Sequence, residues 1–116
     1  MMTSTLQGRP APTTPGLSYW ASQFRSAGFY RDGLRFSDYA PAFYVGIAAH
    51  LEHPDRDFDD PRLDLRARYQ RIRLGSVLNW EQAEDAARSA WQRAKENAEA
   101  AQAQIGRRVA QLTAHP

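Results

Sequence analysis

Residues 80–112 read WEQAEDAARSAWQRAKENAEAAQAQIGRRVAQL and repeat every eleven positions. Aligned in three blocks, the repeat forms four columns: Trp80, Trp91 and Gln102; Ala83, Ala94 and Ile105; Ala87, Ala98 and Val109; and Ala90, Ala101 and Leu112. Eleven residues make almost three turns of an α-helix, so all four columns lie on one stripe. The repeat therefore predicts a long amphipathic helix that buries one face.

The rest of the chain predicts one small helical domain around this helix. Its 116 residues are 42% hydrophobic, which is enough for one modest core. No stretch shows the strict alternation of a half-buried strand. We therefore expect an all-α protein, a small helical bundle with a long C-terminal amphipathic helix of eleven-residue period. Residues 1–16 are expected to form a disordered tail, 17–101 the helical domain, and 102–116 a helical extension in contact with another copy.

A helix ahead of the repeat carries a packing signal of its own. We expect it from about Asp38 to Leu51, with Ser37 or Asp38 as its N-cap. Gly46 lies in a stripe of small residues on this helix, and a glycine there costs roughly 1 kcal/mol relative to alanine. Its use is then to let another backbone approach closely. The alanine-lined long helix is the expected partner.

Two further helices are expected, one before and one after this helix in the sequence. An aromatic segment beginning at Leu17 has helical spacing and is expected to end near Gly28. The second, at residues 61–74, opens with Asp60 as N-cap and stops at Gly75.

The long helix is expected to overhang its own domain. Asn79 and Gln82 have the spacing of a capping box at its start. Residues 80–112 make a helix about 50 Å long at ~1.5 Å per residue, against a radius of gyration of about 13 Å for a compact domain of this size. The apolar residues beyond the domain are then expected to contact a second copy: Ala98, Ala101, Ile105, Val109 and Leu112. The alternative is a helix that breaks at Gly106, with a disordered end.

Composition narrows the location and the kinds of partner. The absence of cysteine excludes disulfides and thiolate metal sites, and it fits a cytoplasmic location. The first residues lack the apolar run of a signal peptide, and no stretch is long enough to span a membrane. A net charge of +2 is too small for nucleic-acid binding by bulk charge alone. We expect a cytoplasmic protein with no membrane partner.

The sequence contains no recognisable catalytic constellation. The serines lie in no nucleophile-elbow context, and neither a phosphate-binding glycine loop nor a dinucleotide fingerprint is present. His50 and His53 stand three apart and are followed by aspartates, which makes them candidates for a carboxylate–imidazole metal site. A solvated helix end is the favoured interpretation of these histidines. We expect no enzymatic activity and no cofactor.

The segment 61–74 supplies the alternative function. Its basic side chains could grip phosphates while an interleaved aromatic ring stacks on a base: Arg62, Arg66, Arg68, Arg71, Arg73 and Tyr69. Against nucleic-acid binding, Asp64 lies within the cluster and four nearby aspartates are positioned to pair with the arginines. A salt-bridged outer face is the favoured interpretation.

Two sequence blocks carry a family resemblance. The first holds Tyr19-Trp20, Phe24, Tyr30, Phe36, Asp38-Tyr39, Pro41-Ala42 and Gly46, and the second holds Leu78-Asn79-Trp80 and Ala87-Arg88-Ser89-Ala90-Trp91. Together they resemble a group of short uncharacterised bacterial proteins with a tyrosine-rich Asp-Tyr-x-Pro-Ala block and a Leu-x-Trp helix ending in Arg-x-Ala-Trp. The resemblance covers about residues 18–93 and implies a loose link to stress responses, without a chemistry. This chain departs from the pattern at Phe43-Tyr44-Val45, where an arginine is common, and in its extended tail after Trp91.

Taken together, these patterns predict a non-enzymatic helical protein with a structural or interaction role. We expect it to form a homo-oligomer, a dimer or larger, through the long helix, and the resemblance adds bacterial stress tolerance as an expected setting. A nucleic-acid-binding module that uses residues 61–74 is the alternative.

Overall fold

The computed structural model describes the backbone of residues 16–114 and the side chains of residues 16–110. Its elements are four α-helices and two short 3-10 helices: α2 (Leu17–Gln23), η1 (Phe24–Ser26), α3 (Phe36–Glu52), η2 (Pro61–Leu63), α4 (Leu65–Ile72) and α5 (Trp80–Ala114). No strand occurs between residues 16 and 114, so the all-α prediction is confirmed. The expected N-terminal tail, except for Gly16, and the side chain of Leu112 lie outside the described part of the chain.

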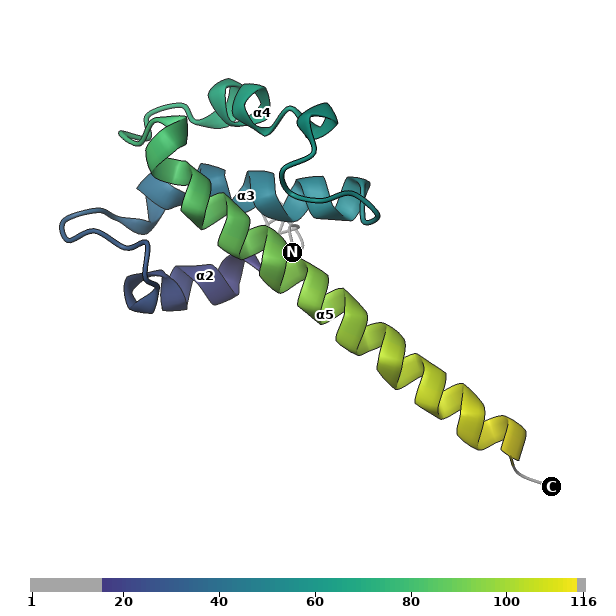
Figure 1. The fold of residues 1–116 in the computed structure, drawn as a ribbon. Coiled ribbons are helices and arrows are strands. Elements are labelled where there is room, and N and C mark those ends of the chain that lie inside the picture. Colours follow the sequence, from purple (N-terminus) through teal and green to yellow (C-terminus); the bar gives the residue numbers. More distant parts are fainter. Residues whose placement is uncertain (1–15, 115–116) are drawn as a thin grey trace, which may run out of the picture.

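The architecture is a crossing of two helices with smaller elements on either side (Figure 1). α5 passes over α3, while α2 and α4 lie on opposite sides of this crossing. The C-terminal part of α5 extends far beyond the other helices. The radius of gyration is 17.1 Å, well above the ~13 Å of a compact domain of this size. The predicted overhang is therefore confirmed.

The crossing of α3 and α5 depends on Gly46. A Cβ atom at this position would overlap the carbonyl oxygen of Ala87, and it would lie only 3.0 Å from the backbone nitrogen of Trp91. Ala83, Ala87 and Ala90 on α5 are fully buried at this contact. The predicted close approach between Gly46 and the alanine-lined helix is therefore confirmed.

An aromatic cluster fills the space between α2, α3 and the loop that joins them. The rings of Trp20 and Phe43 stack with centroids 4.8 Å apart, and Phe29 packs against both. The hydroxyl of Tyr39 donates to the carbonyl oxygen of Phe29 and accepts from the backbone N–H of Arg31, both at 3.1 Å. The loop is thereby fixed to α3 by packing and by hydrogen bonds.

The predicted start of α3 was two to three residues too late. The helix begins at Phe36, and Arg35 is its N-cap instead of Ser37 or Asp38. Asp38 occupies the third helical position, where its Oδ2 accepts from the backbone N–H of Arg35 at 2.9 Å. A carboxylate on the first turn can accept a hydrogen bond from the backbone N–H of the N-cap residue. Its presence in the sequence therefore indicates that a helix starts nearby, but it does not identify which residue is the N-cap.

The predicted single helix over residues 61–74 is wrong. It is divided into η2 and α4 by Asp64, which adopts a left-handed conformation with φ 52°. The predicted N-cap itself is confirmed, because Asp60 Oδ1 accepts from the backbone N–H of Arg62 at 2.9 Å. The turn at Asp64 lets Leu63 and Leu65 both enter the core. α4 ends at Ile72. The chain then turns at Leu74, which has φ 47°, one residue before Gly75.

The start of α5 matches the predicted capping box. The backbone N–H of Asn79 donates to Gln82 Oε1, and that of Gln82 donates to Asn79 Oδ1, both at 2.9 Å. From Trp80 the helix continues without interruption through Gly106 to Ala114. The alternative of a break at Gly106 is therefore contradicted.

Candidate functional site

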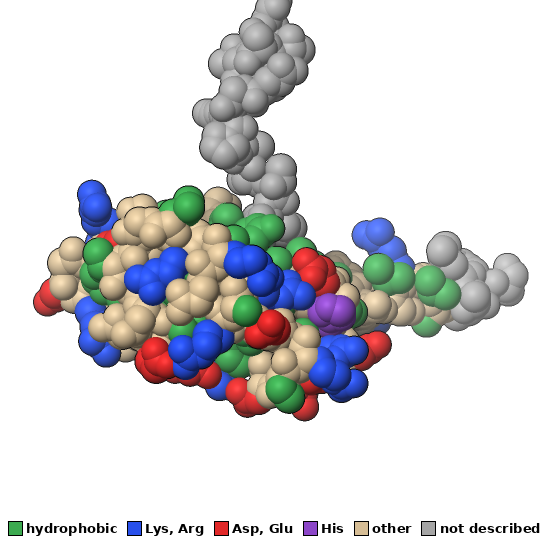
Figure 2. Space-filling model, turned by 90° about the horizontal axis from the view of Figure 1, so that it is seen from above, with side chains coloured by type: hydrophobic (Ala, Val, Ile, Leu, Met, Phe, Trp, Pro, Cys, Tyr) green, Lys and Arg blue, Asp and Glu red, His purple; other side chains and the backbone are tan. Residues whose placement is uncertain are grey.

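The projecting half of α5, residues 92–114, is the most exposed part of the structure. Every side chain from residue 96 to residue 110 is exposed. Two of them are large and apolar, since Ile105 is 60% exposed and Val109 is 51% exposed. In Figure 2 this arm extends to the right of the body and carries hydrophobic side chains beside basic ones.

The predicted interface residues lie along this arm. Ala98, Ala101, Ile105 and Val109 have exposed side chains on the stripe that is buried farther toward the start of α5. Leu112 belongs to the same helix, although its side chain lies outside the described residues. The stripe thus passes from core to surface along one continuous helix.

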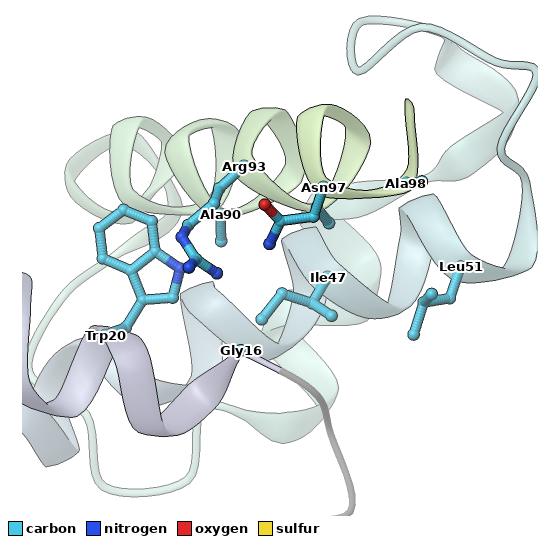
Figure 3. Close-up of a pocket in the computed structure, with 9 residues that line it drawn as sticks. Gly16, Trp20, Ile47, Leu51, Ala90, Arg93, Asn97 and Ala98 are labelled. Atoms are coloured by element: carbon cyan, nitrogen blue, oxygen red, sulfur yellow. The ribbon is translucent and has the colours of Figure 1, made fainter. Parts of the chain in front are cut away.

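An apolar cavity lies where α3 and α5 diverge. Its volume is about 270 Å³, and it is lined by Gly16, Trp20, Ile47, Leu51, Ala90, Arg93, Ala94, Asn97 and Ala98. Figure 3 shows α5 above this space and Ile47 and Leu51 of α3 below it. Leu51 is 57% exposed at its edge. The cavity therefore lies at the boundary between the core and the projecting half of α5.

Polar groups at the cavity edge are few. The guanidinium of Arg93 lies over the ring of Tyr19, 3.5 Å from its centroid, and Asn97 stands one helical turn farther on. Nε1 of Trp20 is buried and has no hydrogen-bond partner among the described residues. The remaining lining is aliphatic or aromatic, so the cavity favours apolar contents.

Most of the predicted arginine cluster is occupied by neighbouring acceptors. Arg62 forms an ion pair with Asp60 at 2.8 Å, and Arg66 forms one with Glu81. The hydrogen bonds that Arg62 donates to the Asp60 carboxylate lower the pKa of Asp60 to about 2.

Two more arginines of the cluster are engaged as well. Arg68 pairs with Glu52 at 2.9 Å, and Arg73 donates to the carbonyl oxygen of Ser76 at 3.0 Å. Arg71 lies exposed on α4. On the face seen in Figure 2, basic and acidic side chains are interspersed, which agrees with a salt-bridged outer face.

Tyr69 is placed differently from the expectation for a stacking residue. Its side chain is 0% exposed, and its hydroxyl donates to the carbonyl oxygen of Leu78 at 2.7 Å. Ser76 completes this buried network, since its hydroxyl donates to the carbonyl oxygen of Asp38 at 2.6 Å. The ring of Tyr69 is thus part of the core and is not available to stack on a base.

The two histidines differ in their burial. His50 is buried and packs edge-on against Trp91, with centroids 5.5 Å apart. Burial lowers the pKa of His50, Lys95 lowers it further, and Glu99 opposes the shift. His53 is the partly exposed C-cap of α3. Among the described residues, no group of three or more metal-binding side chains could hold an ion.

Two features of this region were not predicted from the sequence. Arg88 joins the loop before η2 to α5, because it donates to both carboxylate oxygens of Asp59 and lies 4.5 Å from the centroid of Phe58. The cavity was the other feature. Its signal was present as alanines spaced four apart at 90, 94 and 98, facing Ile47 and Leu51 at the same spacing.

Comparison of the chain with known protein families, with curated proteins and with solved structures finds no match. Within residues 16–114, no helix has the length and apolar character required to cross a membrane.

Proposed function

We propose that this protein is a helical interaction module that self-associates through the projecting half of α5. The observation that carries this proposal is the exposure of Ile105 and Val109 on the same stripe that is fully buried at Ala83, Ala87 and Ala90. Covering two large aliphatic side chains removes apolar area from water, which stabilises by about 25 cal/mol per Å². A second copy presents the same helix and can cover both.

The geometry favours this role over nucleic-acid binding by the arginine segment. Arg62, Arg66 and Arg68 each form an ion pair with a carboxylate, and Tyr69 is buried. A phosphate would have to displace these carboxylates. The stress-related setting implied by the family resemblance is compatible with a structural module and adds no further support.

Native mass as a function of concentration tests the proposal. We expect the mass in sedimentation equilibrium to rise from the 13.1 kDa of one chain toward a multiple of it. The double substitution Ile105→Gln and Val109→Gln retains good helix propensity but removes the apolar side chains. It should weaken association by about tenfold or more, because each buried aliphatic side chain is worth roughly 1.5–3 kcal/mol.

Ala103→Gln is the matched control. It introduces the same residue into the same helix, but residue 103 lies on the opposite face of α5 from the stripe. Association of this variant should equal that of the wild type. A wild-type mass that stays at one chain up to millimolar concentration would refute the proposed function.

A further inference from the structure

Within the projecting half of α5, positions of the apolar stripe are paired about a point between residues 101 and 102. Ala98 and Ile105 are equally far from this point, and so are Ala94 and Val109. On the side nearer the domain both positions hold small residues, and on the side nearer the C-terminus both hold large ones. The helix therefore carries a small-residue half and a matching large-residue half in reverse order.

The small-residue half opens onto the cavity. Ala94 and Ala98 form part of its wall on the α5 side, and Ile47 and Leu51 line it from α3. The alanine side chains on this wall of α5 are too short to fill the 270 Å³ beneath them, and the longer Arg93 and Asn97 lie at the cavity edge. An aliphatic side chain brought in from outside would lie against apolar surface on two sides.

We propose that two copies of this chain pair their projecting halves antiparallel, about a two-fold axis between residues 101 and 102. This proposal rests on the proposed function and specifies its geometry. Ile105 of each copy lies against Ala98 of the partner, and Val109 lies against Ala94 of the partner. Each large-residue half thereby enters the other copy's cavity, in an interface that uses the same patch on both subunits.

The cavity volume agrees with this occupant. A cavity of about 150 Å³ holds benzene, with six carbons, so 270 Å³ holds roughly ten. The side chains of one isoleucine and one valine together have seven carbons, which leaves room for imperfect packing. Parallel pairing would instead place Ile105 against Ile105 and Ala98 against Ala98, and it would leave the cavity open.

The contact area indicates the strength of the dimer. Antiparallel pairing about this axis overlaps the accessible part of the stripe over residues 94–109, a length of about 24 Å at ~1.5 Å per residue, because Trp91 is buried in its own core. A strip ~10 Å wide on each chain, together with the cavity walls, gives a buried area on the order of 1,000 Å². This is the lower limit for a specific interface, so we expect dissociation constants in the micromolar range.

Disulfide trapping distinguishes antiparallel from parallel pairing. The chain has no cysteine, so any disulfide must come from introduced residues. Ala98→Cys and Ile105→Cys are prepared as separate full-length variants of different mass, mixed at about 0.1 mM, above the expected dissociation constant, and oxidised. The mixed disulfide should exceed either self-disulfide by about tenfold, because antiparallel pairing separates like positions by ~10 Å, beyond the ~7 Å Cα limit of a disulfide.

Each other outcome has a definite meaning. Self-disulfides that dominate over the mixed product would establish parallel pairing and overturn the antiparallel geometry, while the proposed function would stand. A native dimer that yields none of the three products would also overturn this register. A protein that remains monomeric in the mass measurement would remove both proposals.

Filling the cavity in advance tests the second half of the proposal. Ala94→Phe places a ring where the partner's Val109 would enter, so it should weaken dimerisation by about tenfold or more. Ala103→Phe adds the same ring nine residues later, on the opposite face of the helix, and should leave dimerisation unchanged. Circular dichroism confirms that both variants remain folded. Unchanged dimerisation of Ala94→Phe would show that the partner does not occupy the cavity.

Discussion

At the scale of single residues, two glycines on helices have opposite consequences for stability. A Cβ at Gly46 would overlap the backbone of Ala87, whereas a Cβ at Gly106 would meet nothing within 4 Å. Gly46→Ala should therefore lower the free energy of unfolding by about 2 kcal/mol, as overpacking of up to ~3 kcal/mol exceeds the ~1 kcal/mol gained in helix propensity. Chemical denaturation followed by circular dichroism measures this change.

Gly106→Ala is the matched substitution in open space. It should stabilise the local helix by roughly 1 kcal/mol, and amide hydrogen exchange around residue 106 should slow by about fivefold. A stabilising effect of Gly46→Ala would contradict the close approach of α3 to α5.

The buried imidazole of His50 predicts a pH dependence of stability. Its pKa lies below the ordinary 6.5 because burial disfavours the charged form. Between the folded and unfolded pKa values the unfolded chain binds more protons, so this contribution to stability is complete above about pH 6.5 and is lost as the pH falls below it. His50→Gln should flatten the decline of unfolding free energy between about pH 7 and pH 5.

His53→Gln is the control for this titration. His53 lies three residues away at the end of α3 and is partly exposed, so its removal should leave the slope of the wild type in place. Parallel profiles for wild type and His50→Gln across this range would contradict the assignment. The acidic groups held by arginines, such as Asp60, act at lower pH and do not interfere with the comparison.

At the scale of helices, α5 is divided into a core half and a projecting half. Trp91, at the boundary, is 5% exposed and packs against His50 and Phe58. Trp91→Ala should lower the free energy of unfolding by about 3–5 kcal/mol, as expected for removal of a buried indole. Ile105→Ala should change it by less than about 0.5 kcal/mol at concentrations where the protein is monomeric. A loss below 1 kcal/mol for Trp91→Ala would argue strongly against its role as a core anchor.

Helix existence could be predicted from the sequence better than helix boundaries. The eleven-residue repeat identified α5, and the spacing of Asn79 and Gln82 located its start, because both signals are local. The division at Asp64 could not be predicted, because aspartate in the left-handed region is stabilised by tertiary packing of Leu63 and Leu65 on either side. Leu74 adopts a left-handed conformation, with φ 47°, one residue before Gly75, where the helix was expected to stop.

The helix that carries the candidate site could be predicted from the sequence, but the cavity beside it could not. Helical periodicity shows which residues share a face, so Ala98, Ile105 and Val109 could be assigned to one stripe. A cavity arises where two helices diverge, and this depends on their crossing angle and on the length of α3. Likewise, the burial of Tyr69 follows from the contact of α4 with the loop at Leu78, which periodicity within α4 does not reveal.

At the scale of the whole molecule, the antiparallel arrangement fixes the distance between the two domains of a dimer. The domain is centred on the crossing of α3 and α5 near Ala87, about fifteen residues from the proposed axis, or ~22 Å along the helix. Two domains then lie about 44 Å apart at opposite ends of the paired helices, whereas parallel pairing places them side by side. Small-angle X-ray scattering of the dimer should therefore give a pair-distance distribution with a second maximum near 45 Å, and the Ala94→Phe variant, measured at the same concentration, should lose this maximum. A dimer with a single maximum would mean that both domains lie at one end of the helix pair.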